Sequence, residues 1–136
     1  MKDDLEHDVA EWLRFVEMDR TSAYHLFKTM YPKPLEIICF HCQQAAEKAI
    51  KALFVLKEIE VIKIHDLTIL LKKIETFFLI PLSVKNASDD LTPFAATFRY
   101  PQYPDIDEDI TRKALADMDT VIDWCKEQIK NNGNQY

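Results

Sequence analysis

Residues 40–53 read FHCQQAAEKAIKAL, and their spacing predicts one helix with two different faces. At about 100° per residue, an apolar sector collects Ile38, Ala45, Ala49, Ala52 and Leu56, with Cys42 and Leu53 at its edge. A polar sector roughly a quarter-turn wide collects His41, Gln44, Lys48 and Lys51. Small side chains allow a neighbouring helix to approach closely. The polar sector offers hydrogen-bond donors and positive charge without a matching row of carboxylates, so this segment predicts a binding face.

The composition favours an all-helical domain. The chain has 136 residues, of which 48% are hydrophobic and 29% charged, enough to bury a core. Its single glycine is Gly133, so the chain lacks the residue that hairpin turns and phosphate-cradling loops need. P-loop and dinucleotide-binding motifs are therefore excluded. We expect one domain over residues 1–136, with an all-α fold: an up-and-down antiparallel bundle of four to five helices.

Helical periodicity and turn residues predict the order of the elements. The expected helices are 5–30, 35–57, 65–81, 84–98 and 106–131, the fourth being the weakest. Asp66 is the expected N-cap of the third helix, whose apolar face continues to Phe77 and Phe78. Pro93 is expected to kink the fourth helix, and Ile110 to face the core from the fifth. The β-branched residues 59–64 predict an extended connection, and residues 99–105 a proline-rich loop.

The charge distribution leaves two interpretations open. The net charge of −6 discourages long-range attraction of nucleic acid. Residues 28–73, however, carry eight basic and five acidic side chains, a local balance of +3. This basic segment either recognises a small anion or an acidic partner, or its positive balance is a chance distribution of charges.

The cysteines indicate a reducing compartment. Cys39, Cys42 and Cys125 do not suggest a disulfide framework, and Cys39 with Cys42 would supply at most half a zinc site. We therefore expect buried packing thiols and no metal or cofactor. The chain shows neither a signal core nor an apolar run of membrane length, so a cytoplasmic location without membrane contact is expected.

Four landmarks in order carry a family resemblance: Trp12 early in a long helix, the segment 41–53, His65-Asp66-Leu67, and Arg99-Tyr100-Pro101 before an acidic helix start. Together they resemble the HEPN domain (higher eukaryotes and prokaryotes nucleotide-binding), over nearly the whole chain. The most specific part is Gln44-Ala45-x-Glu47-Lys48-x-x-Lys51-Ala52. The match is nearest to the nucleotidyltransferase-associated or stand-alone bacterial type.

This resemblance implies a bundle of four or five helices that often forms a homodimer. Many bacterial members stand beside a small nucleotidyltransferase in toxin–antitoxin pairs. Many other members are metal-independent ribonucleases that use an Arg-x4–6-His motif.

The chain departs from the ribonuclease motif. Counting from Arg99, the histidine positions hold Pro104, Asp105 and Ile106, and no histidine follows His65. Arg20 and His25 match the spacing inside the first helix, where they point about 140° apart, so that match is chance. No catalytic residue is assigned, and whether the chain is an enzyme stays open.

The candidate ligand-binding residues are His41, Gln44, Lys48, Lys51, His65, Arg99 and Tyr100. In the functional interpretation, Lys48, Lys51 and Arg99 contact phosphate. His41, Gln44 and His65 orient it. The alternative is a solvated helix face with a surface ion pair between Glu47 and Lys51. In the same alternative His65 holds an inter-helix turn, and Arg99 pairs with a nearby acid.

Three functions remain. The first is a HEPN-type binding module for a nucleotide, RNA or a nucleotidyltransferase partner, in a toxin–antitoxin-like system. The second is a degenerate metal-independent ribonuclease, with His65 or His41 replacing the missing histidine beside Arg99. The third is a purely structural assembly protein.

Overall fold

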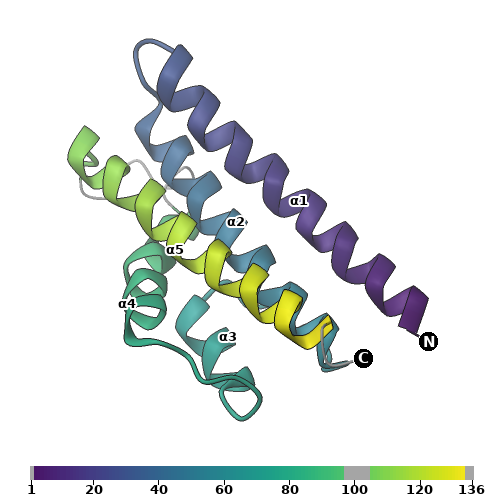
Figure 1. Ribbon diagram of the computed structural model, residues 1–136. Coiled ribbons are helices and arrows are strands. Elements are labelled where there is room, and N and C mark those ends of the chain that lie inside the picture. Colours follow the sequence, from purple (N-terminus) through teal and green to yellow (C-terminus); the bar gives the residue numbers. More distant parts are fainter. Residues whose placement is uncertain (1, 97–104, 134–136) are drawn as a thin grey trace.

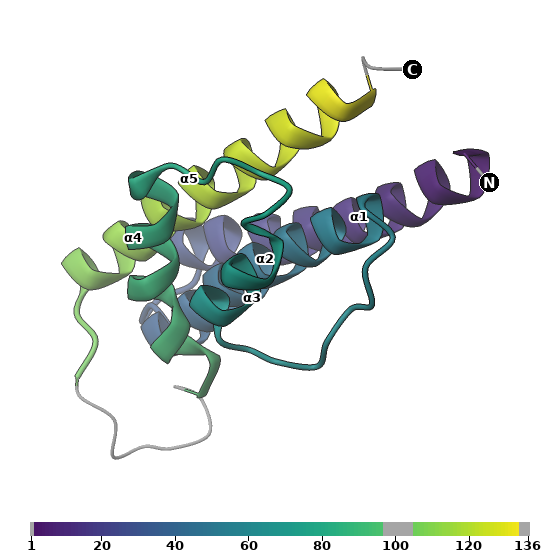
Figure 2. The ribbon, with the colours of Figure 1, turned by 90° about the horizontal axis from the view of Figure 1, so that it is seen from below.

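The computed structural model describes residues 2–96 and 105–133. Its elements are α1 (Lys2–Thr29), α2 (Leu35–Leu56), α3 (Leu67–Ile74), α4 (Leu82–Leu91), the 3₁₀ helix η1 (Thr92–Ala96) and α5 (Glu108–Gly133). No strand occurs within these two ranges, so the predicted all-α bundle is confirmed. Helix α1 runs antiparallel to α2 (Figure 1). The chain then passes through α3, α4 and η1, and α5 lies alongside α2 (Figures 1 and 2).

Helix α2 is the centre of the fold. It contacts α1, α3, α4, η1 and α5. Four alanines on it are fully buried, and so are Ile50 and Leu53. Burying each large apolar side chain contributes about 1.5–3 kcal/mol, and the alanines keep the neighbouring backbones close. The predicted apolar face of residues 40–53 is therefore the core of the bundle.

The end of α2 is closed by a Schellman motif that contains no glycine. The Ile59 N–H donates to the Phe54 carbonyl at 2.9 Å, and the Glu58 N–H donates to the Val55 carbonyl at 3.0 Å. Glu58 takes the left-handed position with φ 55°. Ile59 packs against the core, as the hydrophobic residue after such a cap commonly does.

Helix α1 is joined to α5 by polar contacts. Asp119 accepts hydrogen bonds from Arg20 Nε, at 2.8 Å, and from the Tyr24 hydroxyl. Burial, reinforced by the hydrogen bond to Asp119, raises the pKa of Tyr24 to about 12. Lys126 adds an ion pair to Glu17 at 2.5 Å. The apolar contact of α1 is mainly with α2, and its buried residues Val16 and Ala23 belong to the shared core.

The third helix is shorter than predicted. Asp66 caps it as expected, accepting the Ile69 N–H at 3.1 Å, but it ends at Ile74 rather than near Pro81. Phe77 is 51% exposed, so its assignment to the apolar face was wrong. Phe78 does reach the core, with its ring centroid 6.0 Å from that of Trp124. A turn after Ile74, and not a further turn of helix, therefore brings Phe78 into the core. The prediction assumed that the helical spacing continued as far as Phe78.

The fourth and fifth helices also differ in detail. As far as Ala96 the predicted helix 84–98 is α4 followed by η1, and its last two residues lie outside the described ranges. Pro93 lies in the 3₁₀ turn because proline has no N–H to continue an α-helix. Ile110 is 41% exposed, not in the core, because Thr111 takes the inward position in the first turn of α5. Thr111 is fully buried and donates to the Asp107 carbonyl at 2.9 Å.

Candidate functional site

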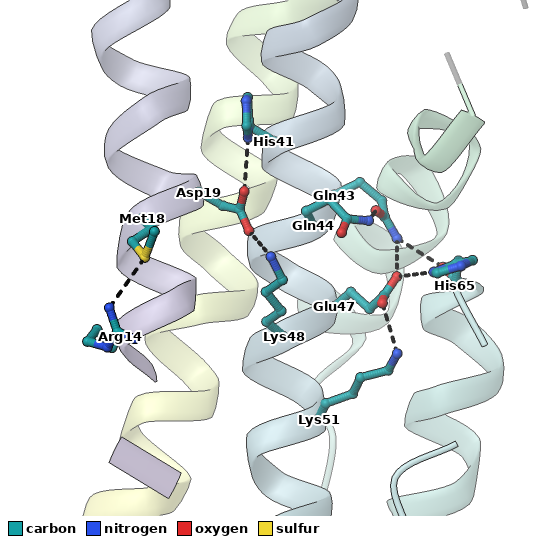
Figure 3. A network of polar contacts seen from close by, with 10 residues as sticks. All are labelled: Arg14, Met18, Asp19, His41, Gln43, Gln44, Glu47, Lys48, Lys51 and His65. Atoms are coloured by element: carbon teal, nitrogen blue, oxygen red, sulfur yellow. Dashed lines mark hydrogen bonds and ion pairs between the residues drawn. The ribbon is translucent and has the colours of Figure 1, made fainter. Parts of the chain in front are cut away.

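The predicted polar sector of α2 divides between two clusters, one on each side of the helix (Figure 3). The Asp19 cluster consists of Asp19 on α1 and of His41 and Lys48 on α2. The Glu47 cluster consists of Gln43, Glu47 and Lys51 on α2 and of His65 ahead of α3. Each cluster has a carboxylate at its centre.

In the Asp19 cluster, one carboxylate joins two helices. Asp19 Oδ1 lies 2.9 Å from His41 Nδ1, and Oδ2 accepts from Lys48 Nζ at 2.5 Å. Burial opposes ionisation of Asp19, but the hydrogen bonds from His41 and Lys48 outweigh it, so the pKa of Asp19 is lowered. Because the carboxylate is ionised, His41 donates through Nδ1 and directs Nε2 away from Asp19.

In the Glu47 cluster, the carboxylate accepts three hydrogen bonds. Oε1 accepts from Gln43 Nε2 at 3.0 Å and from His65 Nδ1 at 2.9 Å, while Oε2 accepts from Lys51 Nζ at 2.9 Å. Gln43 Nε2 also donates to the His65 carbonyl, at 3.0 Å. Gln44 reaches the cluster indirectly, by donating to Gln43 Oε1 at 2.7 Å. The cluster therefore fastens the start of α3 to the middle of α2.

Burial separates the members of the Glu47 cluster into two kinds. The side chains of Glu47 and Lys51 are 5% and 8% exposed, whereas that of His65 is 63% exposed. Burial opposes ionisation of Glu47, but hydrogen bonds from Lys51, Gln43 and His65 outweigh it and lower its pKa. An exposed imidazole is thus held through Nδ1 by a buried carboxylate, with Nε2 directed away from it. Such a histidine can donate a hydrogen bond or exchange a proton.

The structure brings some predicted residues together and separates others. Lys51 and His65 share one carboxylate, and His41 and Lys48 share another. Arg99 and Tyr100 lie outside the described residues. The sector does have matching carboxylates, contrary to expectation, and the Glu47–Lys51 pair is buried rather than on the surface.

Sequence reasoning missed Asp19 and Gln43. Asp19 lies between Val16 and Ala23 on the side of α1 that meets α2, so an acid among core-facing positions was the available signal. Gln43 is fully buried beside alanines, and nothing in its spacing distinguished it from Gln44, which is only half-buried. Both residues act by holding the predicted ones in place.

The cysteines have the predicted packing role. Cys39, Cys42 and Cys125 are free and buried. Burial raises the pKa of Cys39 to about 11 and raises those of Cys42 and Cys125 further. Within the described ranges, no three histidine, cysteine or acidic side chains gather as a metal site would require. No helix in the same ranges combines the length and apolar character needed to cross a bilayer.

The fold and the two clusters define an all-helical bundle whose central helix carries both the core and the polar site. Residues 9–128 match the family model of the HEPN domain, and the chain belongs to that family. The crystal structure of an archaeal HEPN homologue is similar, with a TM-score of 0.67 and 24% sequence identity over 89% of this chain and 97% of the homologue. At that identity the likeness supports the fold alone. None of the curated proteins matches the chain.

Proposed function

We propose that this HEPN domain is a binding module that holds the phosphate of a nucleotide or of RNA at the Glu47 cluster. The observation that carries the proposal is the exposed His65 imidazole, fastened through Nδ1 to buried Glu47 beside buried Lys51. His65 Nε2 donates to a phosphate oxygen when the ring is protonated. Gln43 orients the His65 imidazole, because it contacts both the Glu47 carboxylate and the His65 carbonyl, and Gln44 holds Gln43 in place.

The charges of the cluster suit an anion. Glu47 and Lys51 neutralise each other, so an approaching phosphate meets no net repulsion from them. A protonated His65 then adds one positive charge at the exposed edge. Hydrogen bonds between charged partners are about twice as strong as neutral ones.

Arg99 and Tyr100 complete the proposed site. Support comes from η1, which packs on α2 and begins at the first residue of α3, because Thr92 Oγ1 accepts the Leu67 N–H at 3.1 Å. Arg99 follows the last residue of η1 by three positions in the sequence. A guanidinium there would grip phosphate with two parallel N–H groups.

The test is calorimetric titration with ATP, GTP and a short RNA at low salt. Replacing Arg99 by Gln and His65 by Asn should weaken binding at least 10-fold, since charge-assisted hydrogen bonds contribute about 1.5–3 kcal/mol each. The control is Arg112→Gln, which removes an exposed guanidinium paired with Glu108 on α5. Equal affinity for the wild type and the double variant would refute the site. Absence of binding to all three ligands would favour a structural assembly protein.

The protein also has a surface suited to partners. Phe77, Leu79 and Leu82, in and beside the connection from α3 to α4, are 51%, 95% and 71% exposed. Grouped exposed apolar side chains mark interaction sites. We propose that this surface forms a homodimer contact or binds a nucleotidyltransferase partner in a toxin–antitoxin-like pair. We further propose that the protein acts in the reducing cytoplasm, which its free cysteines suit.

A degenerate metal-independent ribonuclease is the second candidate. A histidine oriented by a carboxylate is the arrangement that general acid–base chemistry uses, and both His65 and His41 have it. Cleavage of a labelled RNA in the presence of a chelator, lost in His65→Asn or His41→Asn, would support it. If the RNA stays intact while calorimetry shows that it binds, the ribonuclease is refuted and the binding module remains.

A further inference from the structure

A pocket on the α1 side of α2 is unused by the site proposed above. It measures about 310 Å³ and is lined by Glu11, Trp12, Phe15 and Lys48. Trp12 and Phe15 are three residues apart on α1, so they share one side of that helix. Ligand pockets range upward from about 300 Å³, so this one suits a small flat group.

Two cationic side chains lie over the Phe15 ring, which lines this pocket. Lys48 Nζ lies 5.9 Å from the centre of the Phe15 ring, and the Arg14 guanidinium carbon lies 4.7 Å from it. The acid on the rim, Glu11, is held by Arg14 at 3.0 Å. Lys48 carries three N–H groups, one of which Asp19 accepts, so it can still donate to an anion.

We infer that this pocket stacks the base of a nucleotide or of single-stranded RNA on Trp12, with the attached phosphate at Lys48. Aromatic side chains interleaved with basic ones are the usual platform for such bases. The inference rests on the proposed function for its ligand class. It adds a second contact region, because the Asp19 and Glu47 clusters lie on different sides of α2 (Figure 3). A single strand crossing α2 would meet a base platform on one side and His65 on the other.

Tryptophan fluorescence tests the inference directly. The chain has two tryptophans, and Trp124 is buried against Phe78, so a Trp124→Phe variant reports Trp12 alone. Titration with AMP should quench the emission saturably, whereas ribose 5-phosphate, which lacks the base, should not. Free N-acetyltryptophanamide corrects for absorption by the base. If Trp124→Phe does not fold, the wild type serves, since its buried Trp124 gives a constant background.

Substitutions in the pocket supply the second readout. Trp12→Leu should weaken AMP binding about 10-fold in calorimetry, the loss expected for one stacked base. Tyr31→Leu is the matched control, because it removes an aromatic ring that is 91% exposed and does not line the pocket.

The outcomes separate this inference from the proposed function. AMP that binds with full affinity to Trp12→Leu, without quenching Trp12 in the reporter variant, overturns the stacking pocket and leaves the Glu47 site standing. Quenching that survives the Arg99→Gln/His65→Asn double change supports the pocket even if the Glu47 site fails. Emission that depends on protein concentration but not on AMP identifies the pocket as a contact between copies and also overturns the inference.

Discussion

Glu47 is the residue on which the described part of the site depends. It holds Lys51, Gln43 and His65 at once and is almost completely buried. Removing one partner of a buried ion pair leaves the other charge without compensation. The cluster is therefore both a structural fastening and the support of the exposed imidazole.

Replacing Glu47 by Gln should destabilise the protein by about 3 kcal/mol at pH 7, because Lys51 keeps its charge in a buried position. The folded-state pKa of Glu47 lies below its ordinary value of 4.5. The stabilisation is thus complete above pH 4.5 and is lost as the pH falls through the folded-state pKa. Urea unfolding of both proteins should show a gap that narrows below pH 4.5. A gap that does not change with pH would contradict the ionised pair.

The cysteine thiols should be inert in the folded protein. Burial raises the pKa of Cys39 to about 11, and all three sulfurs are inaccessible. At pH 8, iodoacetamide should label none of them in native protein and all three in urea, as mass spectrometry would show. Rapid labelling of one thiol under native conditions would mean that its helix opens locally.

Among the helices, the ends that the sequence predicted correctly are those that a particular side chain marks. Asp66 caps α3, and the proline-containing segment after Thr29 ends α1, as the sequence indicated. The end of α3 was not predictable, because an apolar residue such as Phe78 serves a helix and a packed turn equally well. Pro93 did mark the point where the fourth helix changes, and the expected kink takes the form of the 3₁₀ helix η1.

The C-terminal cap of α2 offers a test at this scale. Glu58 has φ 55°, a conformation that costs a residue with a Cβ about 1 kcal/mol and glycine much less. Glu58→Gly should therefore raise the melting temperature by roughly 4 °C. Glu60→Gly is the matched control, since Glu60 lies in the extended connection and has no positive φ. An equal rise in both variants would show that the cap geometry is not the cause.

For the whole molecule, the composition and the helical spacing were enough to predict the class of fold. The partition of the polar sector was not predictable, because it depends on which helix meets each side of α2. Asp19 is 29 positions from Lys48 in sequence, and only the packing of α1 on α2 joins them. Lys51, at the other edge of the sector, turns instead towards Glu47 and is buried.

Stability should be concentrated in the core around α2 and not in the exposed tip between α3 and α4. Leu70→Ala should cost about 3 kcal/mol, because Leu70 is completely buried. Leu79→Ser should change the free energy of unfolding by less than about 0.5 kcal/mol, since Leu79 is 95% exposed. Chemical denaturation measures both. A large loss for Leu79→Ser would favour the homodimer contact over the nucleotidyltransferase partner as the use of this surface.

The central claim, that His65 contacts phosphate at the Glu47 cluster, is tested most directly by NMR of the imidazole nitrogens. The chain has four histidines, which single substitutions would assign. During titration with ATP at low salt, the Nε2 signal of His65 should shift saturably, with the same midpoint as the calorimetric binding curve. A His65 signal that stays unchanged while ATP binds would contradict the claim.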